Sequence, residues 1–121
     1  MGAVTGSLRA PTTALLSRYE ESGRLRYTGR TTTLNTAVRH NLADQLHAGD
    51  DADHPWTGRT FSVEWGSREQ LSVHRVVPEV VAEVAVDIAR DSAGRWRHPV
   101  RLTRIRTDMG PGEVPLFRAA L

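Results

Sequence analysis

The chain has 121 residues, 39% of them hydrophobic, and a net charge of +2, which is typical of one globular domain. It has no cysteine and no lysine, which excludes disulfides, thiolate zinc sites and covalent catalysis by a lysine amine. No apolar run reaches the roughly 18 residues of a membrane span and no leader segment is present, so we expect a cytoplasmic protein that does not enter a membrane.

The chain begins with a short apolar stretch and a predicted hairpin. Residues 1–10 fit either a tail or a strand that belongs to an upstream domain, and the residues alone do not separate the two. Two apolar segments follow, residues 13–19 and residues 24–31, separated by the turn sequence EESG. This arrangement predicts a β-hairpin.

A change of period then predicts one helix. In residues 36–48 the apolar side chains recur every fourth position, as on one face of an amphipathic helix. Asn35 or Thr36 provides an N-cap, and Gly49 provides a stop. Residues 50–58 are a loop by composition.

Two shorter strands are predicted after this loop. Residues 60–65 and residues 71–77 both alternate between apolar and polar side chains. The apolar face of the second strand is expected to hold Leu71, Val73 and either Arg75 or Val77.

The strongest strand signal lies in residues 79–88, where apolar and mostly polar side chains alternate without a break. A turn at residues 91–94 leads into a segment rich in arginine. Its members are Arg95, Arg97, Arg101, Arg104 and Arg106. The segment predicts a β-ribbon that presents guanidinium groups to an anion. Overall, the pattern predicts a mainly β fold, a small barrel of five or more strands with one short helix.

Other groups of residues have simpler interpretations. Metal-ligand residue types gather in one loop without a compact ligand spacing, which favours a solvated acidic loop over a metal site. They are His47, Asp50, Asp51, Asp53 and His54. The tryptophans Trp56, Trp65 and Trp96 could stack on bases, but large aromatic side chains more often complete a core. We assign Trp65 to the core and leave Trp96 open.

Four segments, taken together and in order, resemble the C-terminal oligonucleotide-binding (OB-fold) domain of bacterial ATP-dependent DNA ligases. They read GRLRYTGRT at 23–31, VPEVVAEV at 77–84, GRWRHP at 94–99 and RIRTD at 104–108. The last is similar to nucleotidyltransferase motif VI. Two positions depart from the family pattern: Met109 stands where motif VI usually has lysine, and Val77 replaces the acid before the proline.

The resemblance implies an OB-fold Greek-key barrel over residues 11–109, with residues 1–10 as a tail or a remnant strand of the adenylation domain and residues 110–121 as a C-terminal tail. In such ligases this domain closes over the nucleotide, so that motif VI arginines orient its phosphates, and then clasps nicked DNA. Arg104 and Arg106 match that motif, and Arg101 lies nearby. Further arginines are candidates for contacts to the phosphate backbone: Arg26, Arg30, Arg59, Arg68, Arg95 and Arg97.

The implied partners are a nicked DNA duplex and an adenylation domain in cis or in trans. ATP and Mg²⁺ are implied for the complete ligase, and this chain, having no lysine nucleophile, is expected to bind no cofactor alone and to be no enzyme alone. The sequence leaves the oligomeric state open. Two alternatives remain: an independent OB-fold nucleic-acid-binding protein, and an interaction or structural domain.

Surface arginines are commonly only solvated or paired with neighbouring carboxylates, here Glu79 and Glu83. The motif VI assignment therefore carries a structural requirement. Arg104 and Arg106 should not be held by local carboxylates and turned away from every open groove.

Overall fold

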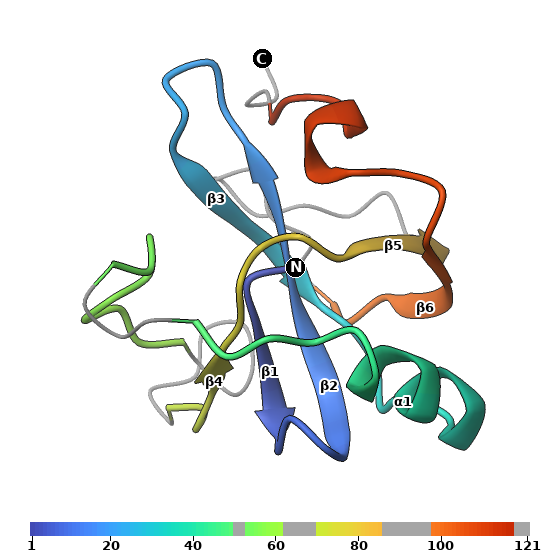
Figure 1. Cartoon of the computed structure of the whole chain (residues 1–121). Helices are drawn as coiled ribbons and strands as arrows, with labels where there is room; N and C mark the ends of the chain where they lie inside the picture. Colours follow the sequence, from blue (N-terminus) through green and yellow to red (C-terminus); the bar gives the residue numbers. More distant parts are fainter. Residues whose placement is uncertain (50–52, 62–69, 86–97, 118–121) are drawn as a thin grey trace.

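The computed structural model describes residues 1–49, 53–61, 70–85 and 98–117 (Figure 1). Within these residues the chain forms six strands in two sheets, one α-helix and one 3-10 turn. Their bounds are β1 Ala3–Gly6, β2 Pro11–Tyr19, β3 Leu25–Arg30, α1 Thr36–Ala43, β4 His74–Arg75, β5 Val81–Ala85, β6 Arg101–Arg106 and η1 Pro111–Glu113. The prediction of a mainly β fold with one short helix is confirmed. No helix in this part of the chain has the length and apolar character needed to cross a membrane.

The first sheet has the strand order β3-β2-β1-β4, and all of its pairs are antiparallel. Its β2–β3 pair confirms the predicted hairpin. The turn is closed by a hydrogen bond of 2.9 Å from the backbone N–H of Gly23 to the carbonyl oxygen of Glu20. Gly23 has φ of 87°, a left-handed conformation that a side chain would disfavour.

Residues 1–10, which fit a tail or a remnant strand by sequence, contribute β1 to the middle of this sheet. Ala3 pairs with Leu15 of β2 on one side and with Arg75 of β4 on the other. Ala3 and Val4 are fully buried, on opposite faces of the strand. The first residues are therefore part of the same folded unit as β2 and β3.

The second sheet is the antiparallel pair β5–β6, which confirms that the alternating strand pairs with the arginine-rich strand. The predicted turn at 91–94 and the end of the long strand lie outside the described residues. Glu83 pairs with Arg104, and Val84 pairs with Leu102, so Thr103 is an extra residue in β6. This β-bulge explains why the two buried residues of β6, Leu102 and Ile105, are three positions apart and not two.

Hydrogen bonds join the two sheets in two places. Next to β3, Thr31 and Val100 form a parallel bridge, in which the N–H of Val100 donates to the carbonyl of Arg30 at 2.9 Å. Before β1, the amino group of Met1 lies 3.3 Å from the carbonyl oxygen of Val80, just before β5. The order around the molecule is thus β1, β2, β3, β6, β5 and back to β1. This order is consistent with a small OB-fold-like domain, although no continuous ladder closes a barrel within the described residues.

The first sheet is covered on both faces. Between the two sheets, α1 inserts Leu42 into an apolar cluster that includes Val4, Val76 and Ile105. On the outer face, residues 53–61 pack against Leu15 and Leu25 through Trp56 and Phe61. Trp56 is 1% exposed, and its indole N–H donates to the carbonyl of Leu25 at 3.0 Å.

The helix begins where the sequence predicted and ends earlier. Asn35 is the N-cap, and its side-chain oxygen accepts a hydrogen bond of 2.9 Å from the N–H of Val38. The helix ends at Ala43 and not at Ala48, because the following residues pair with the chain around β4. Ala48 forms an antiparallel bridge with Val76, and the carbonyl of His47 accepts from the N–H of Val77 at 2.9 Å.

The two short predicted strands are also corrected. Thr60 and Phe61 are not in a strand, and residues 62–65, with Trp65, lie outside the described residues. The strand expected over 71–77 is reduced to β4, two residues long. Val76 is the buried residue at its end, whereas Val77, which was a candidate for the apolar face, is 39% exposed.

Candidate nucleic-acid interface

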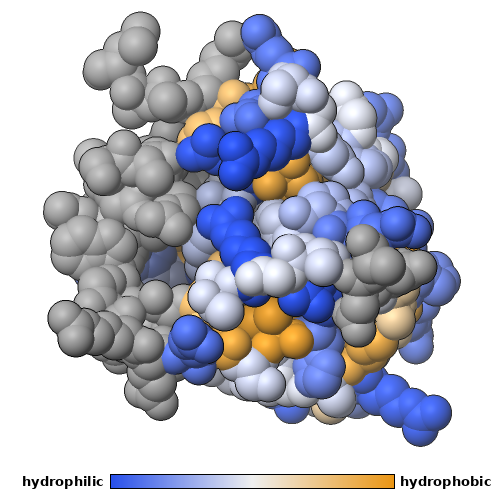
Figure 2. All heavy atoms as spheres, turned by 90° about the vertical axis from the view of Figure 1, so that its left-hand side faces the viewer, coloured by the Kyte–Doolittle hydropathy of each residue, from blue (hydrophilic) through white to orange (hydrophobic). Residues whose placement is uncertain are grey.

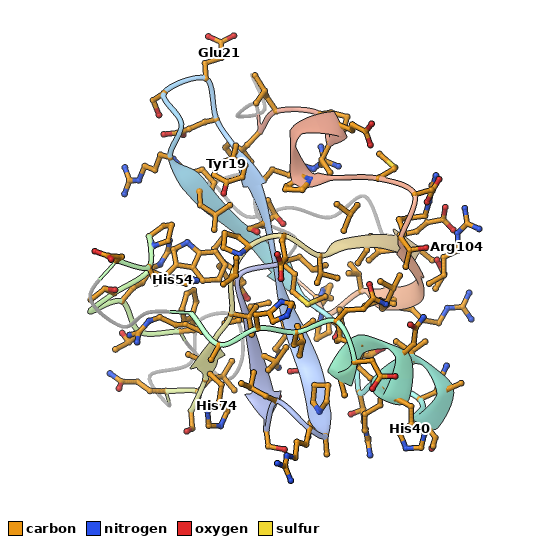
Figure 3. All side chains as sticks on the ribbon, viewed as in Figure 1. Tyr19, Glu21, His40, His54, His74 and Arg104 are labelled. Atoms are coloured by element: carbon orange, nitrogen blue, oxygen red, sulfur yellow. The ribbon has the colours of Figure 1, made fainter. Side chains whose placement is uncertain are left out.

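The bulge at Thr103 directs Arg104 to the exposed face of the β5–β6 ribbon. Arg101 and Arg104 are exposed, while the apolar side chains of Leu102 and Ile105 face the core. Arg104 projects outward from β6, on the side of the molecule opposite His54 (Figure 3). Without the extra residue, a strict period of two would direct position 104 to the same face as Leu102.

Arg106 is held by Asp108 in a bidentate ion pair. Its Nε donates to Oδ1 of Asp108 at 2.8 Å, and its Nη2 donates to Oδ2 at 2.7 Å. The hydrogen bonds from Arg106 lower the pKa of Asp108 to about 2, and the same bonds raise the pKa of Arg106. Asp108 therefore fixes the plane of the Arg106 guanidinium group.

Glu83 bridges the two motif arginines. Its Oε1 lies 3.4 Å from Nη1 of Arg106, and its Oε2 lies 3.5 Å from Nε of Arg104. The hydroxyl of Thr103, the bulge residue, is 2.9 Å from the backbone oxygen of Glu83 and 3.3 Å from Oε2. The contacts of Glu83 to the arginines are long, and those of Asp108 are short.

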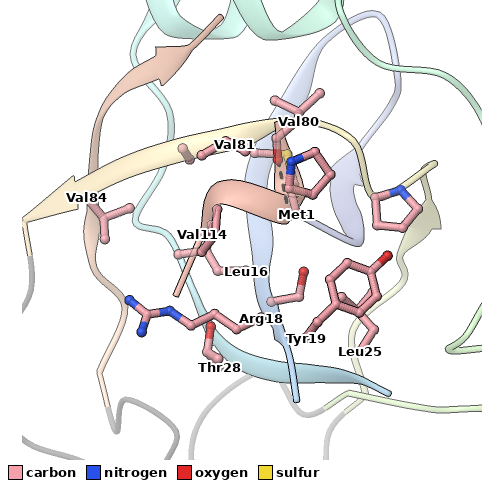
Figure 4. Close-up of a pocket in the computed structure, with 14 residues that line it drawn as sticks. Met1, Leu16, Arg18, Tyr19, Leu25, Thr28, Val80, Val81, Val84 and Val114 are labelled. Carbon is pink, nitrogen blue, oxygen red and sulfur yellow. Dashed lines mark hydrogen bonds between the residues drawn. The ribbon is translucent and has the colours of Figure 1, made fainter. Parts of the chain in front are cut away.

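Both arginines thus contact local carboxylates, one part of the arrangement that would contradict the motif VI assignment. Arg104 nevertheless keeps 61% of its side chain exposed, against 24% for Arg106. Neither lines the pocket of about 90 Å³ that lies between β2, β5 and the C-terminal segment (Figure 4). Arg18 is the arginine in the lining of that pocket. The binding of phosphate by Arg104 and Arg106 stays a prediction.

Three of the other predicted phosphate contacts lie in the described part of the chain. Arg26, on β3, contacts Glu20 at 3.5 Å and lies over the ring of Phe117 at 4.8 Å. Arg59 lies over the ring of Phe61 at 5.1 Å, against the outer face of the first sheet. Arg30 is half-buried at the end of β3. Arg68, Arg95 and Arg97 lie outside the described residues.

The face that carries residues 53–61 is partly apolar. Figure 2 shows hydrophilic side chains across the centre of this face, with apolar areas between them. The aromatic residues beneath are packed against one another, with the rings of Trp56 and Phe61 5.1 Å apart. Because Trp56 is in the core, it is not available to stack on bases.

The histidines named as possible metal ligands have protein partners. Nδ1 of His47 contacts Oε1 of Glu79. His54 is buried, with Nε2 2.9 Å from the carbonyl oxygen of Val76 and Nδ1 accepting from the N–H of Trp56 at 3.0 Å. In the described part of the chain no three His, Asp or Glu side chains could together hold a metal ion. Asp50 and Asp51 lie outside that part.

The family model for the ATP dependent DNA ligase C terminal region matches residues 7–109. The chain belongs to this family. The match over most of the sequence agrees with the resemblance of the four segments, and it includes β2, β3, α1, β5 and β6 of this ligase C-terminal region. No curated protein and no solved structure matches the chain.

Two contacts around the motif arginines in this ligase C-terminal region were missed by the sequence interpretation. Glu83 was treated as one of several neighbours that pair with arginine, whereas it contacts both Arg104 and Arg106. Thr103 was not singled out, although it is the bulge residue whose hydroxyl contacts Glu83. The three-residue spacing of apolar side chains in RLTRIR is the signal that could have predicted the bulge.

Proposed function

We propose that this ligase C-terminal region contacts duplex DNA and orients nucleotide phosphates for a nucleotidyltransferase domain, in cis or in trans. The observation that carries the proposal is the family match over residues 7–109, a range that contains Arg104, Arg106 and Asp108. The catalytic lysine must come from the other domain, because this chain has none.

The geometry of β6 supports this function. The bulge directs Arg104 outward, where its guanidinium group can donate two parallel hydrogen bonds to phosphate oxygens. Arg106 is already oriented by Asp108, so less side-chain freedom is lost when a phosphate binds nearby. Mg²⁺ would be held by the nucleotidyltransferase domain, since no three His, Asp or Glu side chains of the described residues could hold a metal ion.

Adenylylation in trans tests the proposal. The chain is added to a lysine-bearing nucleotidyltransferase domain of an ATP-dependent ligase, and transfer of labelled AMP to the lysine is measured. Replacing Arg104 and Arg106 by alanine should lower the rate by roughly a hundredfold, as expected when preorganised donors to a developing charge are lost. A matched control replaces Arg9 and Arg24, which are exposed and lie in the connections between β1, β2 and β3, and should leave the rate unchanged.

DNA binding by the same proteins separates the alternatives. A ligase domain should bind a nicked duplex, more tightly when the catalytic domain is present, with a salt dependence that reports its phosphate contacts. Preference for single strands without any effect of the catalytic domain would instead identify an independent nucleic-acid-binding protein. If the chain bound no DNA at low salt, and the double variant and the control gave equal rates of adenylylation, the chain would be an interaction or structural domain.

A further inference from the structure

The carboxylate of Glu83 lies in a place that suits a phosphate group. Each of its two oxygens faces one guanidinium group, Oε1 toward Arg106 and Oε2 toward Arg104. Two arginines that share one anion in this way form a common recognition geometry for phosphate. We propose that Glu83 occupies the phosphate position between Arg104 and Arg106 in the free domain, and that an incoming phosphate group must displace it. This inference rests on the proposed function.

The distances distinguish Glu83 from Asp108 in this arrangement. Asp108 accepts two hydrogen bonds below 2.9 Å from Nε and Nη2 of Arg106, which leaves Nη1 directed at Glu83. The contacts of Glu83 are 3.4 and 3.5 Å long, and its side chain is 45% exposed. Long contacts between exposed charges are weak, so Glu83 can be exchanged for another anion while Asp108 stays in place.

Thr103, the bulge residue, contacts both the backbone and the side chain of Glu83. Its hydroxyl donates to the backbone carbonyl oxygen at 2.9 Å and lies 3.3 Å from Oε2. Thr103 is the extra residue of β6, between Leu102 and Arg104 in the strand that carries both motif arginines. The same local distortion therefore exposes Arg104 and places a competing carboxylate beside it.

The consequence is a threshold on phosphate binding. A single weakly bound phosphate, as on any stretch of duplex, competes with Glu83 at a disadvantage because Glu83 is attached to the neighbouring strand. A ligand that presents several phosphate oxygens at once displaces it more readily. The shared chemistry is a phosphate group, and its source is either a nucleotide triphosphate tail or the DNA backbone.

The test compares Glu83→Gln with Glu79→Gln in the full chain. Both substitutions remove one negative charge from an exposed side chain, at 45% and 43% exposure, but Glu79 contacts His47 and not the arginines. Affinities for inorganic pyrophosphate and for a singly nicked duplex are measured by calorimetry and by fluorescence anisotropy. Glu83→Gln should bind at least one probe about fivefold more tightly than Glu79→Gln does. If the affinity for the duplex increases, the slope of log affinity against log salt concentration should become steeper by about 0.9 for each added phosphate contact.

The two probes identify the source of the phosphate, since a gain with pyrophosphate alone indicates the nucleotide and a gain with the duplex alone indicates DNA. Arg104→Gln in the Glu83→Gln background should abolish most of the gain. Thr103→Val, which removes the hydroxyl contact, should produce a smaller gain in the same direction and provides a second measurement if Glu83→Gln does not fold.

Three outcomes would overturn the inference. Equal affinities of Glu83→Gln and Glu79→Gln for both probes would do so, as would a gain that persists without Arg104. In both cases the proposed function would still be supported if the wild-type protein bound pyrophosphate or the nicked duplex. If neither wild type nor Glu83→Gln bound either probe, the proposed function would fail and the inference with it.

Discussion

The pair formed by Arg106 and Asp108 sets the orientation of one arginine at the end of β6. Its two short hydrogen bonds define a plane, which a single contact to a mobile carboxylate would not do. The pair is exposed on the side of Asp108, so its value lies in geometry more than in stability. Asp108 is accordingly a positioning residue in the proposed phosphate site.

The pKa of Asp108 tests this pairing. The Arg106 hydrogen bonds lower it from 3.8 to about 2, so the pairing contributes stability above about pH 4 that is lost as the pH falls toward 2. Arg106→Gln should raise the pKa of Asp108 toward 3.8, as followed by carboxyl carbon NMR. Arg101→Gln removes an exposed arginine of the same strand and should have no such effect. A pKa near 3.8 in the folded wild-type protein would contradict the pairing.

The arginines of this site were predictable as residues, and their partners were not. Arg104 and Arg106 were identified from the order RIRTD within the family-like segments. The contact of Glu83 with both depends on the register of β5 against β6, and that register depends on one extra residue, Thr103. A regular alternation of apolar and polar residues predicts a register without a bulge, so one extra residue shifts every pair beyond it.

Among the elements, α1 shows which structural features are determined by neighbouring residues and which by residues far along the chain. Its start at Asn35 is a side-chain cap that satisfies a nearby backbone N–H, so the sequence contains it. Its end at Ala43 depends on the pairing of Ala48 with Val76, far along the chain, so periodicity alone placed the end too late. The same holds for β4, because only His74 and Arg75 pair with β1 and the next residue, Val76, pairs with Ala48.

Asn35→Ala should lower the free energy of unfolding by about 1 kcal/mol, because the N–H of Val38 loses its acceptor. Urea denaturation should show a lower midpoint with an unchanged slope. Asn41→Ala is the matched control, because Asn41 lies on the exposed face of the same helix and accepts only from the side chain of Gln45. Its effect should stay within about 0.5 kcal/mol. Equal losses for the two variants would rule out the cap as the cause.

On the scale of the whole molecule, the first sheet separates two apolar clusters that share its strands. Val4 and Ala14 belong to the cluster between the two sheets, and Ala3 and Leu15, their neighbours in sequence, belong to the outer aromatic cluster. The backbone just before β1 lies so close to Trp56 that a Cβ on Gly2 would come within 2.5 Å of the Trp56 ring. A single strand, β1, therefore contributes to both clusters, and Met1, just before it, joins the two sheets.

This role of β1 predicts the minimal folded unit. Deleting residues 1–6 removes buried side chains from both clusters and leaves backbone groups of β2 and β4 without their partners, so cooperative unfolding should be lost. The family match begins at residue 7, so sequence similarity alone would permit this deletion.

Deleting residues 110–121, which also lie outside the match, is the comparison. In the described part of that segment, Phe117 donates one backbone hydrogen bond to Tyr19 and its ring contacts Arg26. This second variant should keep a single thermal transition, followed by far-ultraviolet circular dichroism, at a lower midpoint. If the variant without residues 1–6 unfolded as cooperatively as the variant without residues 110–121, β1 would not be required, and the folded unit would begin at β2.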